Sequence, residues 1–163
     1  MTDRFNKWFE WLLLWEGTTF ENDPDDPGGR TKFGIDQRSH PKVDIKNLTK
    51  EGAAQIYWNE YWNAVHAEEL PKGVGEVVAN IAVNTGKGNA SHWLQNAIKV
   101  NSDGIIGENT IKISNQVSPK DTCDRLLTHL EEFYKSIATG KKIKYLKGWL
   151  NRTKSLRDFI TTL

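Results

Sequence analysis

The sequence has one cysteine, no long apolar run and almost no net charge, and each absence narrows the possible functions. Cys123 is alone among 163 residues, so no intrachain disulfide can form and a cysteine-built zinc site is not favoured. No segment approaches the ~20 consecutive apolar residues of a transmembrane helix. The formal net charge of +1 gives no overall field to attract nucleic acid or an acidic partner. We therefore expect no nucleic acid among the partners.

The composition is that of one ordinary globular domain. Hydrophobic residues make up 37% and charged residues 26% of the chain, which is typical of folded proteins rather than disordered ones. The N-terminus has neither the basic start nor the small-residue cleavage site of a signal peptide. We expect a monomer made in the cytoplasm without a signal peptide, with no stable membrane association.

Apolar residues recur at helical spacing through most of the chain. The first such stripe, Phe5 to Leu13, is followed by Glu16 and then by the helix stop signal Gly17. The Pro- and Gly-rich residues 17–36 predict turns with a small hairpin, whose strands would be 18–20 and 31–35. The fold class is therefore mainly α (α+β), with a β-hairpin near the N-terminus. Further helices are predicted at 49–62, 74–85, 90–100, 118–137 and 146–163, with a short one after a turn near 101–107.

Glu16 is the first candidate for chemistry because it ends an apolar helix. Burial disfavours the charged form of a carboxyl group. Glycoside hydrolysis needs a carboxylic acid that stays protonated near neutral pH, so that it can protonate the departing oxygen. The reaction also needs a second carboxylate, and Asp23, Asp25 and Asp26 follow shortly after. The same pattern also fits a solvated helix end followed by turn-forming aspartates, so the residues alone leave both interpretations open.

Several segments occur in a recognisable order over nearly the whole chain: "EG", "NDPDDPGGRTKFGI", "LTKEGAAQIYWNEYW", "LQNAIKVNSDGIIGENTI" and "YLKGWLNR". Together they resemble the glycoside hydrolase family 108 muramidases, which are lysozyme-like enzymes of bacteriophages and bacteria. The resemblance implies a single lysozyme-like domain over residues 1–163. About 1–87 would form the catalytic part and about 88–163 a helical peptidoglycan-binding part, packed as one unit.

The resemblance also implies an activity and a biological setting. The activity would be hydrolysis of the β-1,4 bond between N-acetylmuramic acid and N-acetylglucosamine in peptidoglycan glycan strands, with inversion and without a cofactor or metal. The setting would be a phage endolysin that reaches the cell wall through a holin lesion. The alternatives are a non-catalytic peptidoglycan-binding protein that kept the fold, and a secretion-associated muramidase that remodels the wall.

The family motifs assign the catalytic roles by position. The Glu of the family's EGGY motif, its catalytic acid, falls on Glu16, although this sequence reads "EGTTF" there. The Asp of "DPGG" falls on Asp26, and Asp25 is the alternative because a one-residue insertion makes the register uncertain. Thr31 would supply the hydroxyl that helps to hold an attacking water.

Two further sets of residues are candidates for substrate binding. Tyr57, Trp58 and Tyr61, with Trp62, form two i, i+4 aromatic pairs that suit either core packing or stacking on sugar rings. The amides of Asn80 and Asn84 share one helix face, and the resemblance implies that they bind N-acetyl groups; plain solvent exposure fits equally well. No metal is expected, because "NDPDD" and "NSDGIIGENT" lack the ligand spacing of a calcium loop.

Overall fold

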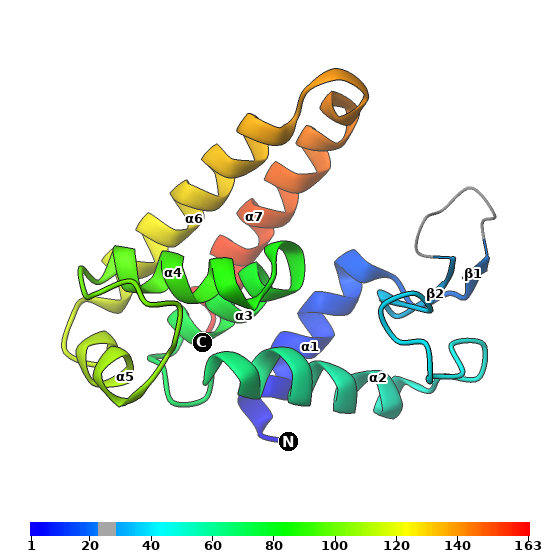
Figure 1. The fold of residues 1–163 in the computed structure, drawn as a ribbon, viewed down its shortest axis with the longest axis horizontal. Helices are drawn as coiled ribbons and strands as arrows, with labels where there is room; N and C mark the ends of the chain where they lie inside the picture. Colours follow the sequence, from blue (N-terminus) through cyan, green and yellow to red (C-terminus); the bar gives the residue numbers. More distant parts are fainter. Residues whose placement is uncertain (23–28) are drawn as a thin grey trace. The chain divides into compact units, whose positions relative to one another are not determined.

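The computed structural model describes residues 1–22 and 29–163 and confirms the mainly α, lysozyme-like fold with a small sheet near the N-terminus (Figure 1). Its tertiary contacts separate into two compact units, Met1–Glu60 and Tyr61–Leu163, which are described one at a time. The packing of the predicted catalytic and peptidoglycan-binding parts as one unit stays a prediction. No helix within the described ranges is both long and apolar enough to span a bilayer.

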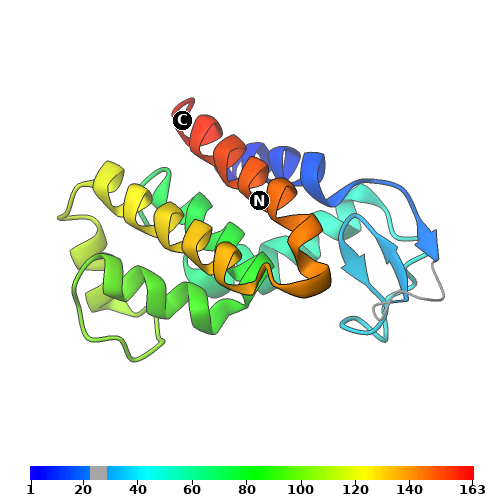
Figure 2. The same ribbon diagram turned by 90° about the horizontal axis from the view of Figure 1, so that it is seen from above.

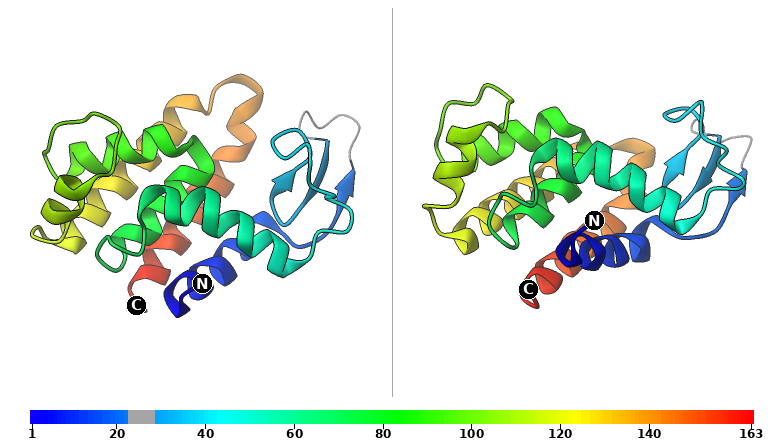
Figure 3. Two further views of the ribbon diagram at one scale, coloured as in Figure 1. Left: turned by 60° about the horizontal axis from the view of Figure 1, so that its bottom comes forward. Right: turned by 90° about the horizontal axis from the view of Figure 1, so that it is seen from below.

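The first unit is built on two helices, α1 (Asp3–Glu16) and α2 (Lys50–Tyr57), which lie side by side (Figure 3). α2 begins at the position that the sequence predicts. The hydroxyl of Thr2 accepts a hydrogen bond from the backbone of Phe5, and the hydroxyl of Thr49 accepts one from Gly52, so each threonine caps its helix. α1 ends at Gly17, whose φ of 76° is a conformation that glycine adopts without strain.

Aromatic side chains fill the space between these two helices. The ring of Phe5 meets Trp58 edge-on at 5.0 Å, and Tyr57 contacts Phe9 at 5.7 Å and Trp8 at 6.4 Å between ring centroids. Phe5, Trp8 and Tyr57 are almost completely buried. Such ring contacts stabilise beyond the burial of apolar area alone, and they fix the end of α2 against α1.

The sheet has three short antiparallel strands in the order β1 (Glu21–Asn22), β2 (Arg30–Lys32) and β3 (Ile35–Asp36). The prediction of one hairpin with strands 18–20 and 31–35 is therefore corrected. Residues 18–20 precede the first strand, and residues 31–35 contain a turn. Phe33 and Gly34 both have positive φ, 54° and 75°, which gives a two-residue hairpin turn of type I′.

The second unit is helical: η2 (Asn63–Val65), α3 (Val74–Thr85), α4 (Lys87–Ala97), α5 (Glu108–Ser114), α6 (Pro119–Ile137), η3 (Gly140–Tyr145) and α7 (Leu146–Ile160). Its longest helix, α6, starts where the sequence predicts, with Ser118 as N-cap and Pro119 in the first turn. Figures 1 and 2 show α6 and α7 side by side, joined through η3. α4 starts at Lys87 rather than near Ala90, since Gly86 alone separates it from α3.

Candidate active site

Glu16 is the last residue of α1, and its half-buried side chain lies against the turn between β2 and β3. A Cβ atom placed on Gly34 would be 2.8 Å from both Cβ and Oε2 of Glu16. Carbon atoms do not approach that closely without displacement, so only glycine fits at position 34. The turn therefore backs directly onto the Glu16 side chain, and the positive φ of Gly34 further disfavours any residue that has a Cβ.

Tyr57 supports this turn from inside the unit. Its hydroxyl donates a hydrogen bond of 3.0 Å to the carbonyl of Phe33, and the same hydroxyl would lie 2.6 Å from a Cβ on Gly34. Tyr57 is only 1% exposed, so of the two alternatives, core packing and stacking on a sugar ring, it takes the first and is no longer a substrate-binding candidate. It positions the turn that contacts Glu16.

Thr31 lies in the middle of β2, opposite Glu21 of β1 and Asp36 of β3. Directly opposed residues point to the same face of a sheet, so one hydroxyl and two carboxylates share that face. The Thr31 hydroxyl is half-buried and donates a long hydrogen bond of 3.4 Å to the carbonyl of Gly29. Glu21, which is exposed, was overlooked in the sequence because the first strand was placed before it.

Asp36 is engaged in a local turn. Burial is the largest single influence on its pKa and opposes ionisation. The hydrogen bonds from the backbone and side chain of Ser39, with the nearby charge of His40, outweigh burial and hold the pKa of Asp36 below its usual value. The Ser39 N–H lies 2.8 Å from Oδ1 of Asp36. Asp36 is therefore an ionised turn-stabilising group.

The two aspartates proposed as the second carboxylate, Asp25 and Asp26, lie outside the described residues. They follow β1 and precede β2 in the sequence. Their assignment stays a prediction that rests on the family motif.

Asn80 and Asn84 lie on α3 in the second unit, and the structure separates their roles. Asn80 is fully buried. Its Oδ1 accepts hydrogen bonds from Nε and Nη2 of Arg152, at 3.2 and 3.0 Å, and from Nδ2 of Asn84, at 3.2 Å. The expectation that Asn80 binds an N-acetyl group is therefore corrected, because its amide oxygen holds the Arg152 guanidinium. Asn84 is half-exposed and stays a candidate for substrate binding.

Because Asn80 holds the buried Arg152 guanidinium, we expect it to contribute to the stability of the fold. Asn80→Ala leaves the buried Arg152 guanidinium without this acceptor, which is expected to cost about 1–3 kcal/mol and to lower the melting temperature by roughly 2–4 °C per kcal/mol. Asn84→Ala is the matched control, since it removes a donor to the same oxygen from a residue that water reaches. Thermal unfolding of both variants checks this, and equal melting temperatures would contradict it.

The residues of the two aromatic pairs lie at and within a π-helical segment, η1 (Trp58–Trp62), and not in a continuous α-helix. A π turn changes which residues share a face, so the pairing expected from i, i+4 spacing does not hold. Tyr57 and Trp62 are buried, whereas Trp58 and Tyr61 are half-exposed. Trp58 and Tyr61 therefore stay candidates for contact with sugar rings.

The segment "DGIIG", which precedes α5, forms a loop organised by one side chain, Gln95 of α4. Its amide nitrogen donates to Oδ1 of Asp103 at 2.7 Å and to the carbonyl of Ile105 at 2.9 Å, and its amide oxygen accepts from Gly104 N–H at 2.9 Å. The Gln95 hydrogen bond is the main cause that lowers the pKa of Asp103.

Across residues 1–22 and 29–163, no group of three or more His, Cys, Asp or Glu side chains is arranged to hold a metal ion.

The mainly α fold and the turn-held glutamate together define a lysozyme-like protein. Residues 9–86 match the family described as "Glycosyl hydrolase 108", and residues 89–154 match the one described as "Predicted Peptidoglycan domain". Residues 9–86 therefore belong to glycosyl hydrolase family 108, and a peptidoglycan-binding region follows them. The chain is accordingly a glycoside hydrolase that acts on peptidoglycan.

The chain also resembles a solved structure over nearly its whole length. The chain is similar to the protein in "Structure of Brucella abortus SagA", with a TM-score of 0.82 and 28% sequence identity over 97% of this chain and 94% of that chain. The comparison with curated proteins found no match. The similarity covers both the glycoside hydrolase segment and the peptidoglycan-binding region.

Proposed function

We propose that this protein is a muramidase that hydrolyses the β-1,4 bond between N-acetylmuramic acid and N-acetylglucosamine, with Glu16 as the general acid. The observation that carries the proposal is the position of Glu16, which ends an apolar helix beside the turn at Gly34, where an added Cβ would lie 2.8 Å from its carboxylate oxygen. A proton donor must be held within hydrogen-bond reach of the leaving oxygen. A half-buried carboxyl group at the end of an apolar helix supports this role.

The proposed reaction is a single displacement with inversion. Glu16 donates its proton to the glycosidic oxygen as the bond to the anomeric carbon breaks, and positive charge develops on the N-acetylmuramic acid ring. Asp26, or Asp25 in the alternative register, takes a proton from a water molecule that attacks the anomeric carbon from the opposite face. Thr31 orients this water. Inversion requires about 6.5–9.5 Å between the two carboxyl groups.

The second carboxylate is tested by two neighbouring substitutions. We expect Asp26→Asn to lower the hydrolysis rate of purified sacculi by about 10²–10⁴-fold, the usual contribution of a general base. Asp25→Asn, the same chemical change one residue away, is expected to lower it less than tenfold. The opposite ranking would assign the base to Asp25. If both variants keep full activity, neither aspartate is the base, and Glu21 on the face of Thr31 becomes the residue to replace.

The proposed setting is a bacteriophage endolysin. The enzyme would act as a monomer on the host wall after release through a holin lesion, causing host cell lysis and an antimicrobial effect. This part of the proposal rests on the resemblance to phage enzymes.

A further inference from the structure

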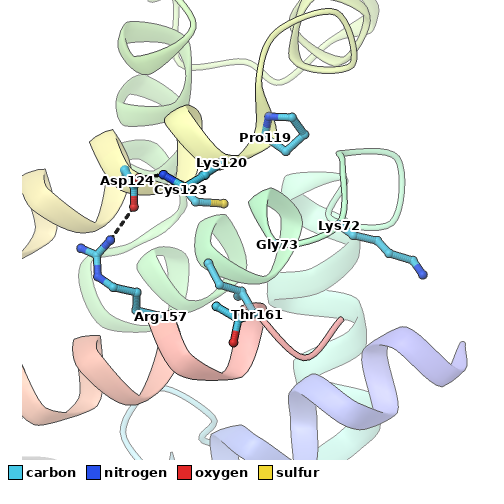
Figure 4. Close-up of a pocket in the computed structure, with 9 residues that line it drawn as sticks. Lys72, Gly73, Pro119, Lys120, Cys123, Asp124, Arg157 and Thr161 are labelled. Carbon is cyan, nitrogen blue, oxygen red and sulfur yellow. Dashed lines mark hydrogen bonds and ion pairs between the residues drawn. The ribbon is translucent and has the colours of Figure 1, made fainter.

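The second unit contains a cavity of about 450 Å³ far in sequence from the glutamate site. Figure 4 shows it between the first turns of α3 and α6 and the end of α7. Its volume falls within the range of about 300–1,000 Å³ that is common for ligand pockets. Every residue that lines it belongs to the second unit.

The floor of the cavity is apolar and uncharged. Gly73, Cys123 and Ile160 form it, and a Cβ on Gly73 would lie 3.4 Å from Sγ of Cys123 and 3.7 Å from Cβ of Ile160. Burial, reinforced by the charge of Glu76, raises the pKa of Cys123 to about 12, so the thiol is neutral at physiological pH. Small apolar groups suit this floor.

The rim of the cavity is cationic. Lys72, Lys120 and Arg157 line it together with a single carboxylate, Asp124. That carboxylate is already shared, because Arg157 donates to it at 2.6 Å and Lys120 at 3.2 Å. Arg157 also lies 3.5 Å from a carboxylate oxygen of Glu131.

Lys72 is the cation that remains open to a ligand. Its side chain is exposed, and it makes no hydrogen bond or ion pair with residues in the described ranges. Figure 4 shows it beside Gly73, at the start of α3. The N-terminal ends of α3 and α6 are capped by their own side chains, Glu76 on Gly73 N–H and Ser118 on Asp121 N–H, so the charge available to a ligand is that of Lys72. The cavity therefore favours a ligand that combines a carboxylate with small apolar groups.

We propose that this cavity binds the stem peptide of peptidoglycan, with a peptide carboxylate at Lys72 and an alanine methyl group on the floor. The proposal rests on the proposed function, since it names a second part of the same polymer. Stem peptides are short, acidic and rich in alanine, whereas glycan rings are usually bound on aromatic faces, and no aromatic side chain lines this cavity. Pro119, Lys120, Cys123 and Asp124 lie within the region that matches the peptidoglycan-binding family.

The test measures binding of a glycan-free stem tetrapeptide, made of L-alanine, D-glutamate, diaminopimelate and D-alanine, to the full-length protein by calorimetry or NMR titration. We expect saturable binding by the wild type and at least tenfold weaker binding by Lys72→Glu. Lys154→Glu is the matched control, because Lys154 is an exposed residue of α7 that does not line the cavity, and its affinity should stay within about twofold of wild type. Added salt should weaken the binding, since exposed charges are screened.

Two outcomes would overturn the proposal: no binding by the wild type, or equal affinity of the Lys72→Glu and Lys154→Glu variants. Hydrolysis is measured in parallel on intact sacculi and on glycan strands stripped of peptide. We expect Lys72→Glu to slow hydrolysis of sacculi only. If the wild type cleaves neither substrate yet binds the peptide, the muramidase proposal fails and the peptide site stands, so the two failures are distinguishable.

Discussion

Glu16→Gln is expected to lower the rate of peptidoglycan hydrolysis by about 10²–10⁴-fold, because it removes the proton donor. Glutamine has nearly the same size and shape as glutamic acid, so the contact with Gly34 is kept. The fold should therefore remain, with a melting temperature close to that of the wild type. The rate is measured as the loss of turbidity of chloroform-treated Gram-negative cells, and folding is measured by thermal unfolding.

The matched control for this substitution is Glu10→Gln on the same helix. Glu10 is exposed and pairs with Lys50 at the surface, and such pairs contribute only about 0–1 kcal/mol. This variant should clear the suspension as fast as the wild type. A Glu16→Gln protein that is folded and clears it equally fast would show that Glu16 is not the acid.

Gly34→Ala is expected to impair both stability and activity. A left-handed conformation costs an alanine about 1–2 kcal/mol, and overpacking of a filled site costs typically about 1–3 kcal/mol more. The added methyl group would displace either the Glu16 carboxylate or the Tyr57 hydroxyl. A shift of about 1 Å in a catalytic group can cost about 10²-fold in rate, so we expect a loss of that order. Thermal unfolding and the turbidity assay measure the two effects.

Gly29→Ala is the control that separates the steric clash with Glu16 and Tyr57 from the conformational cost of a positive φ. Gly29 also has a positive φ, 71°, but a Cβ there would meet no atom of residues 1–22 or 30–163 within 4 Å. It should lose stability by the conformational cost alone and keep most of its activity. Gly29 and Gly34 variants with the same activity would contradict the role of the turn in holding Glu16.

The parts of the structure that local chemistry determines were predictable from the sequence. Thr2, Thr49 and Ser118 each cap a helix through their own hydroxyl groups, and Gly17 ends α1 one residue after Glu16. These signals act within a few residues of the chain. They were enough to place Glu16 at the end of a buried helix.

The parts that depend on distant residues were not predictable. The turn at Phe33 was missed because Asn, Asp or Gly is usual where both central residues have positive φ, and its carbonyl is held by Tyr57 from another helix. The hydrogen bonds between Asn80 and Arg152 join residues far apart in the sequence. Arg152 is the last residue of the segment "YLKGWLNR". Its place in that segment was the only feature of the sequence that singled out Arg152.

The π turn explains a third difference between the sequence-based prediction and the structure, which is the burial of the aromatic residues. Spacing along an α-helix predicts that Trp58 and Trp62 share one environment, but η1 has the wider π geometry and only Trp62 is buried. Sequence patterns favour α-helical spacing by default, and π segments are rare. Only the structure therefore shows which of these aromatic residues are buried.

The most direct test of the central claim is to digest purified sacculi with the wild type and with Glu16→Gln and to identify the new reducing ends by mass spectrometry. A muramidase that uses Glu16 as its acid produces reducing N-acetylmuramic acid ends with the wild type and, with the variant, at least about 10²-fold fewer. Equal yields from the two proteins, or reducing N-acetylglucosamine ends from the wild type, would contradict the account.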